Sequence, residues 1–423
     1  MSELASAKSS PSSAELFDLK KTILFAAEHS PSFDSSRRAL KVAELEEKSA
    51  GAYLAPSVDL KVTHGILDSA PRLGRNPLNS EFDLGLTESL FDNGISETGS
   101  KIATLKRKEA QLRFEDQKNK LSLEIASTYL TYSLNEKLKE IQEKQYNFLK
   151  KKYESISKDY YQGVKLKKDF VRFKTQVSRG EISLFNAYNE AERSKGELMR
   201  LIGANLALGS RIEFVPIAIE AIKNEPYDFK LDVENHPQYL AAQLQKEANS
   251  LSADMILKKN LPEWLLSAGI NYASSDYLGP GKSFSDVDKT NWYALLTVKY
   301  NIYDGGIRSR NSEAAIQKQS IQNNELDSEL LLLGSTLSQL RLQFYQSQKT
   351  YGLAKELLEL EKDSISYIER EYQNGKVNYL ELTNGLESLS DAEIKFYSAS
   401  AEQQNLKYTL LYHQGLLYEE IIK

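Results

Sequence analysis

The sequence predicts an α+β membrane protein in which one structural plan occurs twice, and three observations lead to this fold class. Turn residues recur at a fixed distance: Phe91–Gly94 resembles Tyr303–Gly306, and the offset of 212 residues holds as far as Gly203 and Gly415. Apolar residues at heptad spacing predict long helices packed as in a coiled coil. Four segments that alternate apolar and polar residues predict strands long enough to span a membrane.

The composition excludes several classes of protein. The chain of 423 residues contains no Cys, only four His and a net charge of -5. Disulfides, thiol catalysis and Cys-ligated zinc are therefore excluded, and no general attraction to nucleic acid is expected. No two His lie at metal-ligand spacing, and no nucleophile–base or cofactor-binding pattern occurs, so we expect no enzyme activity, cofactor or metal site. The absence of any run of about eighteen apolar residues rules out a transmembrane helix but not a transmembrane β-barrel.

The N-terminus, MSELASAKSSPSSAEL, has no basic segment followed by an apolar one, so no signal peptide is visible. Two explanations remain open. Either the protein is not exported, or the sequence is a mature form with an added Met.

A helix is expected at the start of each copy, where the offset becomes 206 residues and pairs Pro31 with Pro237. Proline suits the first turn of a helix, because the N–H that it lacks would have no intrahelical partner there. We expect these two helices to end at about Tyr53 and Lys259.

The longest helices carry the strongest periodic signal. From Leu326 to Tyr372, a 4-3 spacing meets apolar residues at every position except Ser347 and Glu361. This seam alone is typical of a dimeric or an antiparallel coiled coil. In the first copy, the segment Gly94–Lys158 would form a helix of roughly 97 Å at ~1.5 Å per residue, which is longer than a globular domain needs.

The four predicted strands have one apolar face. The two Trp residues, Trp264 and Trp292, lie near strand ends, where an aromatic girdle would lie in a membrane barrel. The alternative is an ordinary soluble sheet with one buried face. The predicted apolar face consists of Val58, Leu60, Val62, Phe82, Leu84, Leu86, Trp264, Leu266, Ala268, Ile270, Tyr272, Trp292, Ala294, Leu296, Val298, Tyr300 and Ile302.

Four strands cannot close a barrel, and unpaired sheet edges are not tolerated in lipid. Three chains with four strands each would give about twelve strands and remove every edge. If the sheet spans a membrane, the sequence therefore predicts a homotrimer.

The chain resembles the TolC-like outer-membrane efflux proteins, also called outer membrane factors, over about residues 15–420. The resemblance rests on the repeat, on the turn Tyr303–Gly306, and on two helix-break segments, Tyr160–Asp169 and Tyr372–Leu382. It implies a homotrimer with about twelve strands in a bacterial outer-membrane barrel and a twelve-helix α-barrel in the periplasm. It further implies a passive exit duct of a tripartite efflux pump or type I secretion system. Its partners would be a periplasmic adaptor, an inner-membrane pump or ABC transporter, and the lipid bilayer, with no nucleic acid.

The resemblance also implies an order of segments. The expected segments are an N-terminal segment and helix (1–55), two barrel strands (56–91), a long helix, tip and return helix (92–203), an equatorial linker (204–235), a second helix (236–261), two further strands (262–303), and a second long helix, tip and return helix (304–423).

Gate residues are carried over by position. Tyr372 and Asp169 match a Tyr–Asp contact that closes the periplasmic end in this family, and Glu381 matches one acidic ring. Asn384 stands where a second acidic residue is usual, so that ring is expected to be neutral here. The alternative for Asp169 and Glu381 is a plain helix-start carboxylate, favoured by the helix dipole, and Tyr372 could simply continue the apolar seam.

The tips and the turns complete the expected sites. Val377 replaces a basic residue that helps to latch the closed end in this family, which leaves its network half preserved. Five tip residues are candidates for adaptor docking: Gly163, Val164, Gly375, Lys376 and Val377. Strand-to-helix turns are expected at Asp92, Gly94, Asp304, Gly305 and Gly306, with no phosphate-binding pattern after them. The alternative function is a soluble, long coiled-coil structural protein with a small β domain.

Overall fold

The computed structural model describes residues 15–52, 55–66, 78–164, 166–204, 212–219, 234, 236–274 and 289–423. The chain divides into two compact units. Unit 1 consists of Met1–Arg38, Arg113–Tyr239 and Leu331–Lys423, and unit 2 of Ala39–Leu112 and Leu240–Leu330. The structure is mostly helical, with few strands. Of the expected linker 204–235, only 204, 212–219 and 234 are described, and the N-terminal 14 residues lie outside the described part.

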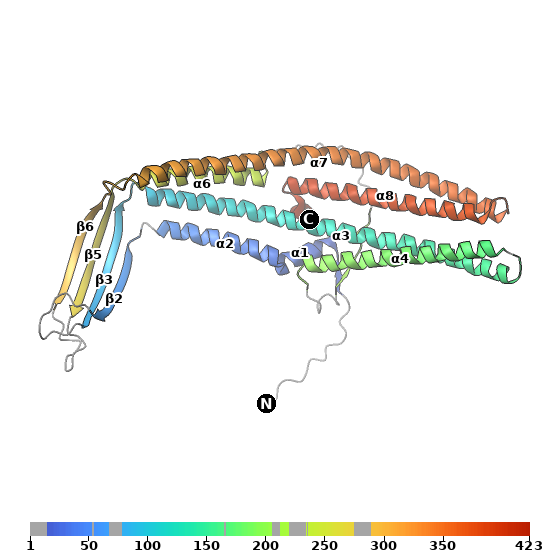
Figure 1. The fold of residues 1–423 in the computed structure, drawn as a ribbon, viewed down its shortest axis with the longest axis horizontal. Coiled ribbons are helices and arrows are strands. Elements are labelled where there is room, and N and C mark those ends of the chain that lie inside the picture. Colours follow the sequence, from blue (N-terminus) through green and yellow to red (C-terminus); the bar gives the residue numbers. More distant parts are fainter. Residues whose placement is uncertain are drawn as a thin grey trace, which may run out of the picture. The chain divides into compact units, whose positions relative to one another are not determined.

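Helices of equal length occur at repeat-related positions (Figure 1). The longest pair has 67 residues, the return helices have 35, and the helices that begin at proline have 22. Their starts and ends are offset by 212 residues in the two hairpins and by 206 in the shorter pair, as for the turn residues. These helices are α2 (Pro31–Ala52) and α6 (Pro237–Lys258), α3 (Ile95–Tyr161) and α7 (Ile307–Gln373), and α4 (Lys167–Leu201) and α8 (Tyr379–His413).

The seam of α7 packs within the chain. In unit 1, Leu333, Leu337 and Phe344 of α7 form a buried cluster with Leu410 of α8. Ser347, one of the two polar residues in the seam, is also buried, and its hydroxyl donates a hydrogen bond to the Phe344 carbonyl at 2.8 Å. The heptad spacing therefore serves an antiparallel α7–α8 hairpin of one chain. None of the helices in the described part of the chain contains an apolar stretch of the length that a membrane-spanning helix requires.

Unit 2 contains a four-stranded antiparallel sheet in the order β2-β3-β5-β6. The last strand is shorter than the sequence suggested, because Tyr300 and Ile302 follow its end. Its final pair joins Lys299 to Glu263, the first residue of β5, and Pro262 before it has no N–H to extend the ladder. The strands are β2 (Ser57–Ile66), β3 (Leu78–Phe91), β5 (Glu263–Ser274) and β6 (Lys289–Lys299).

The register of this sheet sorts side chains onto two different faces. Leu60, Leu84, Ile270 and Trp292 are aligned across the four strands on one face. Apart from His64, Glu88 and Thr290 toward the strand ends, the described residues of this face are mostly apolar. The face is also open, since Leu60 is 68% exposed and Trp292 is 81% exposed. The opposite face is largely polar, apart from Leu265 and Leu295. It carries Ser57, Asp59, Lys61, Thr63, Glu81, Asp83, Thr87, Ser267, Asn271, Asn291, Tyr293 and Thr297.

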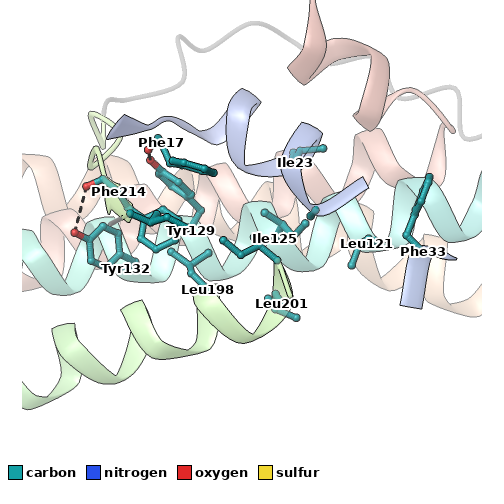
Figure 2. Packing of buried hydrophobic residues seen from close by; sticks show 13 residues of the cluster. Phe17, Ile23, Phe33, Leu121, Ile125, Tyr129, Tyr132, Leu198, Leu201 and Phe214 are labelled. Carbon is teal, nitrogen blue, oxygen red and sulfur yellow. Dashed lines mark hydrogen bonds between the residues drawn. The ribbon is translucent and has the colours of Figure 1, made fainter. Parts of the chain in front are cut away.

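The main core of unit 1 surrounds two short strands that the sequence analysis did not predict. β1 (Glu15–Phe17) pairs in parallel with β4 (Ile212–Phe214), and α1 (Leu19–His29) follows β1. Figure 2 shows the aromatic side chains of Phe17, Tyr129, Tyr132 and Phe214 gathered with aliphatic residues of α1, α3 and α4. A final short helix, α9 (Leu417–Ile422), places Tyr418 and Ile421 against the same cluster.

The Tyr129 hydroxyl joins the two short strands to α3. It lies 2.7 Å from the Phe17 carbonyl oxygen and 2.6 Å from that of Val215, and its side chain is fully buried. Burial raises the pKa of Tyr129, so the phenol stays protonated and can donate its hydrogen.

We expect Tyr129→Phe to lower the free energy of unfolding by about 1–3 kcal/mol, because a buried carbonyl loses its donor. Chemical denaturation in detergent would measure this loss. Tyr188→Phe, at an exposed position of α4, is the control. Equal stability of the Tyr129 and Tyr188 variants would contradict this role of the hydroxyl.

A histidine pair lies at another junction of unit 1. His236, just before α6, is almost fully buried, and its Nε2 lies 3.3 Å from Nδ1 of His413 at the end of α8. The backbone N–H of Gln238 donates to Nδ1 of His236 at 3.2 Å. Neutral His236 must then carry its proton on Nε2, and this N–H donates a hydrogen bond to Nδ1 of His413. Two neutral imidazoles thus share one hydrogen bond.

Candidate functional site

The helix tips end in the same motif in both hairpins. Gly163 and Gly375 have φ of 77° and 73°, a region that glycine occupies without strain. Gly163 donates its N–H to the Tyr160 carbonyl and Val164 donates to Asp159, which is the Schellman arrangement. Gly375 and Lys376 make the equivalent bonds to Tyr372 and Glu371. Of the docking candidates, Val164 is 70% exposed, Lys376 is exposed, and Val377 is half-buried.

Two of the proposed gate residues, Glu381 and Asn384, lie three positions apart near the start of α8. The Asn378 side chain caps α8 by accepting from the Glu381 N–H at 3.1 Å. The side chains of Glu381 and Asn384 are exposed. Asp169 has the equivalent first-turn position in α4, where the N-cap residue Leu166 supplies no side-chain hydrogen bond.

A cavity of about 1150 Å³ lies between the tips of the two hairpins, within unit 1. Asp169, Tyr372 and Val377 all line it, whereas Glu381 and Asn384 do not. The hydrogen bonds at the described tips include none between Tyr372 and Asp169; instead, the Lys152 ammonium lies 5.3 Å from the centre of the Tyr372 ring. The charged residues that line the cavity are Lys151, Lys152, Arg172 and Arg179, with Asp159 and Asp169 opposing them.

Two residues at this cavity were not singled out from the sequence. The Phe173 side chain is 1% exposed, and its ring packs against that of Tyr379. The Tyr379 hydroxyl donates to Oε1 of Gln176 at 3.3 Å, and burial raises the pKa of Tyr379. Neither residue is repeated in the other copy. Gly385 occupies the position equivalent to Phe173, and Lys167 the position equivalent to Tyr379.

The strand-to-helix turns are built alike in the two copies. Asp92 accepts from the N–H groups of Gly94 and Ser96 at 3.0 and 2.7 Å, and therefore caps α3. Asn93 and Gly94 have φ of 59° and 76°, and Asn93 also donates to the Pro262 carbonyl at 2.8 Å. Asn and Gly tolerate this left-handed backbone better than other residues do.

In the second copy, Asp304 accepts from the N–H groups of Gly306 and Arg308 at 3.0 and 2.9 Å. Gly305 and Gly306 have φ of 67° and 80°. Burial opposes ionisation of Asp92 and Asp304, but the hydrogen bonds outweigh it and hold the pKa of both carboxyl groups below the ordinary value.

Removing one of these caps should cost measurable stability. We expect Asp92→Ala to lower the free energy of unfolding by about 1 kcal/mol, because two N–H groups at the start of α3 lose their acceptor. Asp92→Asn keeps one oxygen acceptor and should lose less. Thermal unfolding of the three proteins would measure the order, and an Asn variant as unstable as the Ala variant would contradict the capping role.

Both Trp residues lie on the apolar face of the sheet. Trp264 pairs with Val298, and Trp292 pairs with Ile270, six residues further along β5. At ~3.3 Å per residue the two levels are roughly 20 Å apart along the strand. Among the described residues, no group of three or more His, Asp or Glu side chains is placed to hold a metal ion.

Comparisons with known proteins find similarity to outer-membrane efflux proteins, in part of the sequence and in the fold. Residues 231–414 match the profile of the outer membrane efflux protein family. This confirms the resemblance found in the sequence, over a segment that begins before α6 and ends just after α8. A search of curated protein sequences finds no match.

Solved structures extend the likeness in fold to almost the whole chain. The outer membrane protein VceC from Vibrio cholerae is 18% identical, with a TM-score of 0.78 over 94% of this chain and 96% of that one. The CmeC outer membrane channel of Campylobacter jejuni is 14% identical, with a TM-score of 0.76 over 94% and 86%. The open state of the Neisseria gonorrhoeae MtrE outer membrane channel is 16% identical, with a TM-score of 0.75 over 96% and 90%. The soluble coiled-coil alternative has no support among these matches.

Proposed function

We propose that this protein is the outer-membrane exit duct of an efflux pump or a type I secretion system. Substrates would pass through it passively from the periplasmic side to the exterior. The observation that carries the proposal is the sheet of unit 2, which exposes an apolar face to the surroundings and a polar face on its other side. Water would penalise the exposed apolar face, whereas lipid would not.

The edges of the sheet support a trimer. β2 and β6 each have one partner among the described strands, so each leaves an edge open. Three copies with four strands would pair these edges and close a barrel of about twelve strands, with the polar face toward the lumen. Trp264 and Trp292 would then lie on opposite sides of the membrane midplane, each toward one aromatic girdle, because they are separated by roughly 20 Å along the tilted strands.

The remaining segments follow from this arrangement. Residues 56–91 and 262–303 would supply the barrel, 92–203 and 304–423 the periplasmic α-barrel, and 204–235 with the chain ends a belt around it. The helix tips with Gly163, Val164, Gly375, Lys376 and Val377 would meet a periplasmic adaptor, which connects the duct to an inner-membrane pump or ABC transporter. The duct itself performs no bond chemistry.

Two measurements on the purified protein test this function. Light scattering in detergent should give the mass of a trimer, and planar-bilayer recording should show stepwise currents. A stable monomer that needs no detergent and forms no channel would overturn the proposal in favour of a soluble protein.

Glu381 offers a finer test at the narrow end. In a trimer, three Glu381 carboxylates would form a ring whose negative charge favours cations. We expect Glu381→Gln to lower the ratio of cation to anion permeability and to weaken block by multivalent cations. Glu387→Gln, another exposed carboxylate of α8, is the control. Unchanged selectivity would assign Glu381 to the simpler role of a helix-start carboxylate.

A further inference from the structure

The contacts around the tip cavity are not the ones that a Tyr–Asp gate requires. The cavity separates hairpin 1, formed by the adjoining ends of α3 and α4, from hairpin 2, formed by those of α7 and α8. Asp169 and Tyr372 face this cavity from opposite hairpins without a hydrogen bond between them. Other residues that line the cavity therefore join the two hairpins.

Two tyrosines of hairpin 2 make the contacts to hairpin 1. The Tyr379 ring packs on Phe173, and its hydroxyl donates to Gln176, while the Tyr372 ring lies beneath Lys152. The two tyrosine rings also meet edge to face, with centroids 6.4 Å apart. Tyr379 is the centre of this group, because it contacts both the other tyrosine and the buried Phe173.

The equivalent residues of hairpin 1 do not make such contacts. Tyr160, the repeat mate of Tyr372, stacks at 4.7 Å on Phe170 of its own hairpin. Lys167, the mate of Tyr379, is exposed. The mate of Phe173 is Gly385, where a side chain would lie 3.0–3.1 Å from Ile365 and Ile368 of the same hairpin. The described aromatic bridge is therefore one-sided: hairpin 2 reaches to hairpin 1 of the same chain.

We propose that Tyr379 and Phe173 form an aromatic latch that holds the two hairpins of each chain together at the tip. This inference rests on the proposed function, because it names Tyr379 as the positioning residue of the periplasmic gate. Separation of the hairpins exposes Phe173 to water, which opposes opening through apolar burial and ring contact. At the described tips, Asp169 makes no hydrogen bond or ion pair with Tyr379 or Phe173, so the proposed latch does not include this carboxylate.

The absence of Cys from the sequence allows a test that does not depend on channel activity. Ile156 lines the cavity and is 7% exposed, so Ile156→Cys provides a single buried thiol. Its rate of labelling by a maleimide in detergent reports how often the hairpins separate. Adding Tyr379→Ala should raise this rate about tenfold, the factor that corresponds to loss of ~1.4 kcal/mol from one aromatic pair.

Three matched variants separate the latch from general damage. Tyr379→Phe keeps the ring and should restore slow labelling. Tyr160→Ala removes a stacked tyrosine from hairpin 1 and should leave the rate unchanged, as should Asp169→Ala. Planar-bilayer conductance should follow the same order, with an increase for Tyr379→Ala alone.

The outcomes distinguish this inference from the proposed function. Slow labelling in the Tyr379→Ala background, or equally fast labelling with Tyr379→Phe, would overturn the aromatic latch even if the protein conducts. Fast labelling only with Asp169→Ala would return the closing role to the Tyr–Asp contact. A protein that forms no channel would refute the duct, and the labelling rates would still decide whether Tyr379 joins the hairpins.

Discussion

We expect Leu296→Arg to destabilise the assembled protein by about 2–4 kcal/mol per chain, the cost of a cationic side chain near the midplane of a membrane barrel. Leu296 is 58% exposed on the apolar face of the sheet and pairs with Leu266. It lies between the levels of Trp264 and Trp292 along the strands. If this face meets lipid, the guanidinium has no water within reach.

Thr297→Arg is the matched control for this substitution. Thr297 is the next residue of β6, and its side chain is also exposed. It lies on the polar face, where its cross-strand partner is Leu265. An arginine there would enter the aqueous lumen and should cost much less. Assembly in lipid vesicles and the unfolding midpoint in urea would measure both variants. Equal tolerance of arginine at the two positions would show that the sheet does not span a membrane in this register.

The second large effect concerns pH and the His236–His413 pair. Burial and the neighbouring His236 lower the pKa of His413 to about 4, from an ordinary value of 6.5. Burial also lowers the pKa of His236, although Asp116 acts in the opposite direction. The Tyr412 hydroxyl and the Gln238 side chain donate to Asp116, at 3.2 and 3.5 Å.

The direction of the pH effect on stability follows from how many protons His413 binds in the folded and in the unfolded state. Between pH 6.5 and 4, unfolded His413 binds a proton and folded His413 does not, so the folded state loses stability as the pH falls. The stability from this group is fully present above pH 6.5. From His413 alone, we expect a loss of about 2 kcal/mol per chain between pH 6.5 and pH 5 as an upper value.

Unfolding midpoints at pH 7 and pH 5 would test this expectation. His413→Gln removes the titrating group and should flatten the dependence on pH over this range. His29→Gln, at an exposed position of the same unit, is the control and should leave the slope unchanged. A slope that is the same in the wild-type protein and the His413 variant would contradict the proposed role of the pair.

Local rules of the chain account for most of the secondary structure that the sequence analysis anticipated. Pro31 and Pro237 start helices because each fixes φ and lacks an N–H that would be unpaired. Gly163 and Gly375 end helices because the left-handed backbone there suits glycine. The two faces of the sheet followed from the period of two along each strand, which places Leu60 and its alternate neighbours on one side.

The tertiary structure alone decided the contacts between distant segments. β1 and β4 have three residues each, which is too few for a period to be recognised in the sequence. Only the tertiary structure brings Phe17 and Phe214 together beside Tyr129. His236 and His413 are ordinary residues in the sequence until the end of α8 reaches the start of α6.

The same distinction applies to the tip. From the sequence by itself, the chain was determined to contain two repeats, paired long helices, four two-faced strands and glycine tips, because each depends on spacing within one segment. Whether Tyr372 meets Asp169 or Tyr379 meets Phe173 depends on how two hairpins approach each other. Packing of rings from the ends of α4, α7 and α8 decides that approach, and no periodic pattern encodes it.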